Sequence, residues 1–289
     1  NVNNTFVFAS ELKAIKEYDK FNNEIDVNSV DDYMRYSCIR APRTIYKKIY
    51  KLEPGSMIKI NIKNIFNLLL DKNFLQHDKF YKFWFRSKDN FIDTKKRSYT
   101  NFDTARNDLE NVLIKSVKSQ LISDVPIGSF LSGGIDSSLI TRIMTTQSNT
   151  KIKSFTIGFS ENDFDESKYA KEISQIIGTE HHEKVLSPTE ALSLVPTLSR
   201  VYDEPFADSS QIPTLLLSQF TKSKVKVALS GDGGDELFGG YNRYFWMNKI
   251  WKFFSWLPFE ARKLIGKILS TIPPNKINLF YFLIFINKN

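Results

Sequence analysis

From about residue 101 onward, the sequence alternates short apolar segments with longer amphipathic ones, and this alternation limits the possible folds more than any other feature. Short apolar segments predict strands, and the longer ones predict helices. Strands that alternate with helices indicate a parallel sheet covered by helices on both faces. We therefore expect a doubly wound α/β domain. The predicted strands are residues 126–131, 153–159, 181–186 and 224–230, and the predicted helices are 137–144, 165–178, 188–200 and one directly before 224.

One more helix is expected ahead of the first strand. Asp103 or Thr104 is suited to cap its N-terminus, because short oxygen-bearing side chains accept hydrogen bonds from the first free amides of a helix. Apolar residues follow at helical spacing and predict the face that packs on the sheet. They are Leu109, Val112, Leu113, Val117 and Leu121.

Two glycine-rich segments follow two of the predicted strands. LSGGIDSS occupies residues 131–138, and SGDGGDELFGGY occupies residues 230–241. We call them the first and the second glycine loop. Ligands of open parallel sheets bind beyond the carboxyl ends of the strands. The two glycine loops are therefore the predicted ligand site.

The first glycine loop has the composition of an anion-binding turn. Gly133 and Gly134 allow a tight turn, and the helix that follows offers free N–H groups and the positive end of its dipole. Three hydroxyl groups add further donors. They belong to Ser132, Ser137 and Ser138. The segment lacks the lysine of the common GxxxxGK[ST] phosphate loop, so it belongs to a different class.

An aspartate, Asp136, stands at the start of that helix, where phosphate oxygens are expected. A carboxylate repels phosphate unless a cation lies between them. Mg²⁺ is usually held by one or two carboxylates together with phosphates and water. The second glycine loop offers further carboxylates in Asp232, Asp235 and Glu236. We therefore predict a Mg²⁺ site formed by Asp136 and Asp235.

Outside the alternating region, the sequence divides into three less regular parts. Residues 1–60 contain short β-like runs around a helical stretch at residues 31–35, and Pro54-Gly55 predicts a hairpin turn. Residues 61–100 are interpreted as a linker and residues 101–260 as the ligand-binding domain. Residues 261–289 are interpreted as a truncated or aberrant tail, because the apolar run 277–286 differs sharply in composition from the chain before it.

Composition narrows the class of protein. The 289 residues carry a net charge of +8, but the 40 basic side chains are interspersed with 32 acidic ones, so no nucleic-acid-binding block is predicted. The single cysteine, Cys38, is typical of a reducing cytoplasm. The run 277–286 has about half of the roughly 20 apolar residues that a membrane-spanning helix needs. We expect a cytoplasmic protein without a membrane partner.

Two other polar clusters have ordinary explanations. His181, His182 and Glu183 suggest a metal site, but adjacent residues of a strand point to opposite faces, which argues against one. The loop at residues 203–213 carries Asp203, Glu204, Asp208 and Ser209. These side chains either line a substrate pocket or cap their own loop, and the sequence leaves both readings open.

The order of these motifs resembles a known family. The first glycine loop is similar to the pyrophosphatase loop of the ATP pyrophosphatase group. Together with the second glycine loop, SFTIGF, GTEHHE and DEPFADSSQIP, it resembles the synthetase domain of glutamine-hydrolysing asparagine synthetases. Upstream, FASELKAI and APRTIYKKIYKLEPGS resemble the closing segments of that family's N-terminal nucleophile glutaminase domain. The resemblance implies an adenine-nucleotide hydrolase type of sheet preceded by a small β-rich glutaminase remnant.

The resemblance also implies a reaction. ATP would activate the side-chain carboxylate of aspartate, which would release pyrophosphate and form a β-aspartyl-AMP, and ammonia derived from glutamine would then displace AMP to give asparagine. By motif, the backbone of Leu131 and Ile157 would hold adenine, and residues 132–138 would bind pyrophosphate. Ser230 and Gly231 would contact the nucleotide. Asp232 stands where many relatives have glutamate, as a candidate base or orienting group.

The chain also departs from the family pattern. The family's glutaminase nucleophile is an N-terminal cysteine, whereas residue 1 is Asn1 and Cys38 lies in mid-chain. We therefore expect a fragment with impaired activity, with a homodimer left open as its assembly. Two alternatives also stay open: a related amidoligase that acts on another carboxylate, and a nucleotide-binding remnant without catalysis.

Overall fold

A computed structural model describes residues 5–58, 81–83, 99, 101–160 and 165–272 of the chain. The chain divides into two compact units, residues 1–230 and residues 231–289. The first unit contains a parallel sheet with its helices and the N-terminal segment. The described residues of the second unit form three further helices. The apolar run at 277–286 and most of the predicted linker lie outside the described residues.

The sheet of the first unit has four parallel strands in the order β5-β4-β3-β6. Each of the four predicted strands is confirmed, and so is the α/β class. Their bounds are Ile127–Phe130 for β3, Lys153–Phe159 for β4, Glu180–Leu186 for β5 and Val227–Leu229 for β6.

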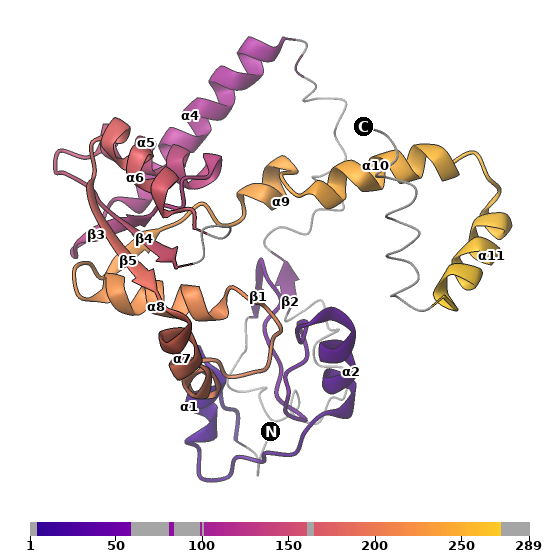
Figure 1. Ribbon diagram of the computed structural model, residues 1–289. Helices are drawn as coiled ribbons and strands as arrows, with labels where there is room; N and C mark the ends of the chain where they lie inside the picture. The colour runs from indigo at the N-terminus through magenta and orange to yellow at the C-terminus, as the bar shows by residue number, and fades with distance from the viewer. Residues whose placement is uncertain (1–4, 59–80, 84–98, 100, 161–164, 273–289) are drawn as a thin grey trace. The chain divides into compact units, whose positions relative to one another are not determined.

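Helices connect these strands and cover both faces of the sheet. Figure 1 shows α5 and α6 on one side of the strands and α8 on the other. This arrangement follows from right-handed crossovers, because the chain moves from β3 to β5 in one direction and returns to β6 in the other. The helices are α4 (Phe102–Gln120), α5 (Ile135–Gln147), α6 (Ser167–Ile177), α7 (Pro188–Val201) and α8 (Gln211–Lys222).

The hydrophobic core of this unit lies between α4, α5 and the sheet. Val117 of α4 and Met144 of α5 are buried in one cluster, and Ile127 and Leu229 of the neighbouring strands pack against it. The predicted apolar face of α4 is confirmed only toward its C-terminal end. Leu109 and Val112 are exposed.

Three predicted helix starts differ from those observed. The helix predicted over 137–144 begins two residues earlier, at Ile135 of α5. Asn101 caps α4, ahead of the predicted Asp103 or Thr104, because its side chain accepts a hydrogen bond from the amide of Asp103. Asp165 lies just before α6, where its carboxylate accepts hydrogen bonds from the amides of Ser167 and Phe159. The predicted end of α6 is confirmed, since Gly178 takes the left-handed conformation.

The N-terminal segment contains α1 (Leu12–Lys16), α2 (Val27–Tyr36) and β1 (Ser56–Ile58). The helical stretch predicted at residues 31–35 lies inside α2. Pro54 and Gly55 form a turn, but not a hairpin, because β1 pairs in antiparallel fashion with β2 (Tyr81–Phe83) further along the chain.

The second unit contains α9 (Gly234–Phe238), α10 (Asn242–Phe254) and α11 (Phe259–Ser270). It begins inside the second glycine loop, so Ser230 belongs to the first unit and Gly231 to the second. None of the described helices is both long and apolar enough to cross a membrane.

Candidate functional site

The first glycine loop joins β3 to α5, at the point where the chain reverses its direction across the sheet. β4 and β5 lie on one side of β3, and β6 lies on the other. Ser129 pairs with Leu229 in parallel register, so the carboxyl ends of β3 and β6 lie at the same edge. A reversal point of this kind is where open α/β sheets bind their ligands.

Gly133 gives the loop its shape. Its φ of +85° lies in the left-handed region, which side chains rarely adopt. A Cβ atom at this position would also lie 2.8 Å from the backbone nitrogen of Ala170 and 2.8 Å from Cβ of Tyr169, both in α6. Glycine is therefore required twice, for the turn and for the close approach of the loop to α6.

The hydroxyl groups of the loop hold it together from inside. Ser137 Oγ accepts a hydrogen bond from the amide of Ser132 at 3.2 Å and lies 3.0 Å from Ser132 Oγ. Ser138 Oγ donates to the carbonyl of Gly134 at 2.6 Å. The serine hydroxyl groups that were predicted to bind phosphate are thus hydrogen-bonded within the loop itself. Ser138 would have to give up its hydrogen bond to the carbonyl of Gly134 before it could contact an anion.

The N-terminus of α5 is open toward this loop. Gly134 is its N-cap residue and has no side chain with which to satisfy the first amides of the helix, which have no partner within the helix. Asp136 lies half-buried in the first turn. The 13-residue helix thus presents free N–H groups next to one carboxylate, which suits an anion accompanied by a cation.

Three buried hydroxyl groups beneath the loop fix its two ends. Ser129 Oγ of β3 lies 2.6 Å from Thr141 Oγ1 of α5, and Thr141 Oγ1 also donates to the carbonyl of Ser137 at 2.7 Å. Thr156 of β4 donates to the carbonyl of Leu131. None of these three residues was among the predicted site residues. The available signal was a serine or threonine inside each apolar segment, at a position that the sheet buries.

The structure limits how the two predicted adenine contacts can work. The N–H of Leu131 already donates to the carbonyl of Phe155 at 2.9 Å, so only its carbonyl oxygen keeps a free lone pair. Ile157 lies beyond the last pair between β3 and β4, Phe130 with Phe155. Peptide groups alternate in direction along a strand, so residues two apart point to the same side. The N–H and C=O groups of Ile157 therefore point to the same side as the carbonyl of Phe155, but beyond the end of β3.

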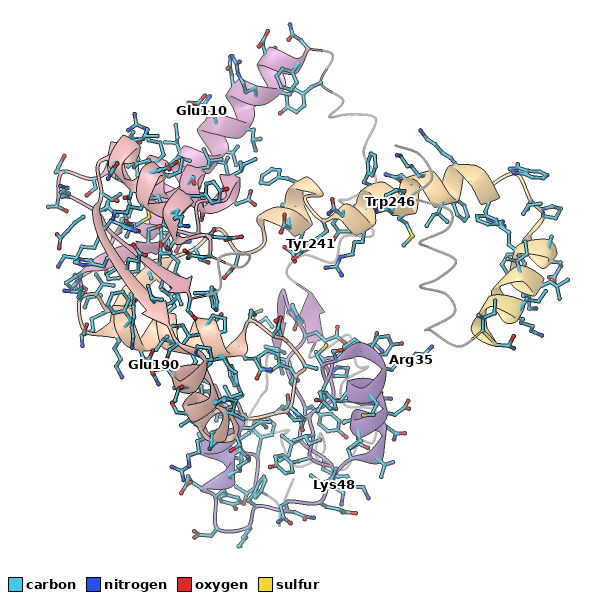
Figure 2. The ribbon with its side chains drawn as sticks, viewed as in Figure 1. Arg35, Lys48, Glu110, Glu190, Tyr241 and Trp246 are labelled. Atoms are coloured by element: carbon cyan, nitrogen blue, oxygen red, sulfur yellow. The ribbon has the colours of Figure 1, made fainter. Side chains whose placement is uncertain are left out.

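The second glycine loop continues from β6 through Ser230 and enters the second unit. Within that unit, Gly233 and Gly239 take left-handed conformations on either side of α9. A side chain at Gly240 would overlap the carboxylate of Asp235. The Tyr241 hydroxyl (Figure 2) donates to Glu236 at 2.7 Å, which lowers the pKa of Glu236 and raises the pKa of Tyr241.

The predicted site residues therefore fall into two groups. One group belongs to the first unit, at the carboxyl edge of its sheet: Leu131, Ser132, Gly133, Gly134, Asp136, Ser137, Ser138, Ile157 and Ser230. Gly231, Asp232 and Asp235 belong to the second unit. Among the described residues, no three His, Cys, Asp or Glu side chains gather into a metal-binding group.

The two adjacent histidines have separate partners. Nδ1 of His181 lies 2.9 Å from the hydroxyl of Ser154, and Nε2 of His182 lies 3.0 Å from a carboxylate oxygen of Glu180. Burial lowers the pKa of His181. The two adjacent side chains therefore contact different strands, His181 a residue of β4 and His182 a residue of β5.

Two acids of the loop between α7 and α8 contact the N-terminal segment. Asp203 accepts a hydrogen bond from the amide of Lys13, and Glu204 accepts one from the amide of Ile45. Asp208 remains local and accepts from the amide of Ser210. Capping therefore fits Asp208, whereas these partners of Asp203 and Glu204 lie outside the loop, in the N-terminal segment.

Comparison with known families divides the chain in the same two parts as its motifs. Residues 108–280 match the family model described as asparagine synthase. Residues 1–68 match the family model described as glutamine amidotransferase domain. The first match covers the sheet, both glycine loops and the three helices of the second unit.

Individual relatives carry matching names. The chain is 32% identical over 272 residues to the glutamine-hydrolyzing asparagine synthetase 1 of Bacillus subtilis, which covers 94% of this chain and 40% of that protein. It is 35% identical over 155 residues to asparagine synthetase B of Escherichia coli, which covers 48% of this chain and 27% of that protein. The solved NMN synthetase of Francisella tularensis aligns with 47% of this chain and 58% of its own, at 16% identity and a TM-score of 0.35.

Proposed function

The chain belongs to the asparagine synthase family, and on this premise we propose that it carries out the ATP-dependent amidation of aspartate to asparagine. The observation that carries the proposal is the first glycine loop, at the reversal point of the sheet. There Gly133 packs on α6, and the N-terminus of α5 opens beside Asp136. Such a loop binds a polyphosphate through N–H groups.

The reaction would proceed in two steps. The aspartate side-chain carboxylate attacks the α-phosphorus of ATP, which forms β-aspartyl-AMP and breaks the bond to pyrophosphate. Ammonia then attacks the acyl carbon, gives up a proton and displaces AMP. The loop amides and the Ser132 hydroxyl would stabilise the charge that develops on the leaving pyrophosphate, usually the largest catalytic contribution. The carbonyl of Leu131 and the peptide of Ile157 would contact adenine, and Ser230 and Gly231 would hold the nucleotide.

The first glycine loop offers a carboxylate that suits Mg²⁺. The carboxylate of Asp136 in the first turn of α5 is a hard oxygen ligand, and we propose that Asp235 supplies a second. The bound ion would neutralise the charge of the polyphosphate. Asp136 alone would repel that charge, so its place at an anion-binding helix start supports the assignment.

Asp232 is the proposed base or orienting group for the incoming ammonia. It is exposed in the turn that precedes α9. An aspartate is one methylene shorter than a glutamate, and even about 1 Å of misplacement can reduce a rate by two orders of magnitude. Asp232→Glu is therefore expected to preserve or raise the amidation rate, whereas Asp232→Asn is expected to lower it.

A nitrogen donor completes the proposed reaction. The chain spans about two fifths of the length of the Bacillus subtilis relative. We propose that ammonia released from glutamine serves as the nitrogen donor, and the match of residues 1–68 to the glutamine amidotransferase domain supports this.

An exchange assay tests the proposed reaction. The chain would be incubated with ATP, Mg²⁺, radiolabelled pyrophosphate and a panel of carboxylic acids. Label entering ATP only when aspartate is present would support the proposal. Exchange with another acid instead would favour a related amidoligase. MgATP binding without exchange for any acid would favour a nucleotide-binding remnant.

A further inference from the structure

The loop between α7 and α8 joins two parts of the chain that are more than 150 residues apart. It follows Val201 and carries the acid pair Asp203 and Glu204. The asparagine synthase model includes this loop, whereas the residues that it contacts all belong to the glutamine amidotransferase match. The contacts therefore connect the two family segments within the first unit.

Asp203 binds the start of α1. One of its carboxylate oxygens accepts a hydrogen bond from the amide of Lys13 at 3.1 Å, and the other lies 3.3 Å from the ammonium group of the same lysine. Lys13 Nζ also donates to the carbonyl of Val201 at 3.2 Å. Burial alone would raise the pKa of Asp203, but the amide and ammonium of Lys13 outweigh it and lower the pKa.

Glu204 binds a different element of the N-terminal segment. It accepts a hydrogen bond from the amide of Ile45 at 2.6 Å and forms an ion pair with Lys51. The Glu204 side chain is only 13% exposed. A carboxylate removed from water is costly unless it is paired and hydrogen-bonded, and both of these partners come from the N-terminal segment.

A backbone hydrogen bond completes the contact. The amide of Ala207 donates to the carbonyl of Ser37 at 2.7 Å, just past the end of α2. The loop thus touches four separate points of the N-terminal segment, which are Lys13 in α1, Ser37 after α2, Ile45 and Lys51. Both acids meet a lysine and an amide, so the charges on the two sides are complementary.

We propose that Asp203 and Glu204 form a docking pair through which the asparagine synthase segment recognises the glutaminase-type segment of the same chain. Each acid accepts a hydrogen bond from one backbone amide, which fixes how the two segments align. Each also pairs with one ammonium group, which supplies the opposite charge. The pair positions the segments and has no part in the chemistry. The inference holds independently of the reaction proposed above.

Hydrogen exchange measured by mass spectrometry on the full 289-residue chain tests the docking pair. Glu204→Gln should accelerate exchange of the Ile45 amide about tenfold or more, because a hydrogen bond to a charged acceptor is replaced by a weaker neutral one. Asp203→Asn should accelerate exchange of the Lys13 amide and should change the exchange rate of the Ile45 amide less. Lys51→Met removes the ion pair but keeps the Glu204 carboxylate as the acceptor for the Ile45 amide. It should therefore accelerate exchange of that amide less than Glu204→Gln does.

The control is Glu172→Gln, an exposed position on α6. It should leave exchange at both Lys13 and Ile45 unchanged. Peptides from β3 and α5 should keep the exchange rates of the unsubstituted chain in every variant. The proposal is overturned if Glu204→Gln leaves Ile45 protected, or if it accelerates β3 and α5 to the same extent, because general destabilisation would then explain the result.

Discussion

The hydroxyl oxygens of Ser129 and Thr141 lie 2.6 Å apart in the interior of the protein, one on β3 and the other on α5. Both side chains are fully buried. They bridge the strand that enters the first glycine loop and the helix that leaves it. The conformation of the loop thus depends on two residues outside its anion-binding face.

Thr141→Val is expected to destabilise the protein by about 1–3 kcal/mol, because it removes the hydroxyl that bonds to Ser129 and to the carbonyl of Ser137. The buried Ser129 hydroxyl then keeps only a 3.4 Å contact with the carbonyl of Phe130. The double variant Ser129→Ala with Thr141→Val removes both hydroxyl groups and should recover part of that loss. Urea unfolding of the single and double variants measures the difference. An equal loss in the single and double variants would show that the two hydroxyl groups are not coupled.

Gly133→Ala and Gly178→Ala form a matched pair for the role of the loop. Both glycines have a positive φ, +85° and +84°, but only at Gly133 would a Cβ meet neighbouring atoms. Gly178→Ala should cost about 1 kcal/mol for backbone strain alone, and Gly133→Ala should cost more and weaken MgATP binding. Equal stability losses measured by urea unfolding would contradict the close packing of the loop against α6.

Most of the sheet could be predicted from the sequence, because strands such as KSFTIGF of β4 are short apolar runs between helical segments. The turn in the first glycine loop was also predictable, since Gly133 and Gly134 mark it locally. Partners that are distant in sequence were not. No local pattern reveals that Thr156 bonds to Leu131, or that Glu204 bonds to Ile45.

Helix starts were predicted less accurately for a related reason. Several polar residues near the start of α4 could serve as its cap, and only the backbone conformation selects Asn101. The turn at Pro54 and Gly55 was correct locally. The predicted hairpin was wrong, because β1 pairs with β2, which lies more than 20 residues further along the chain.

Lys48, labelled in Figure 2, has a φ of +63°, a conformation that side chains rarely adopt. Lys48→Gly should stabilise the protein by about 1 kcal/mol, because glycine tolerates this conformation without strain. Lys48→Ala removes the same charge but keeps the Cβ atom and should give no comparable gain. Thermal unfolding of the two variants compares them directly. A larger gain for alanine than for glycine would argue against backbone strain at this position.

The stability of the sheet should depend on pH through His181. Burial lowers its pKa below the usual value of about 6.5, and Nε2 has no hydrogen-bond partner among the described residues. The unfolded chain therefore binds a proton more readily than the folded one, so stability falls as the pH drops below about 6.5 toward the lowered pKa.

His181→Gln should reduce this acid sensitivity, because glutamine has no charge to gain. The measurement is the urea midpoint of both proteins at neutral pH and at successively lower pH. An identical pH dependence in the two proteins would show that His181 does not contribute to the loss of stability at low pH.

The proposed nucleotide site can be tested by calorimetric titration of ATP into the chain, with and without Mg²⁺, because the first glycine loop is proposed to bind the polyphosphate and Asp136 to hold the metal. We expect the chain to bind ATP in the presence of Mg²⁺, and we expect Asp136→Asn to lose most of the Mg²⁺-dependent affinity while its unfolding transition is retained. A folded chain that does not bind ATP, or an Asp136→Asn variant that binds MgATP as tightly as the unsubstituted chain, would contradict this proposal.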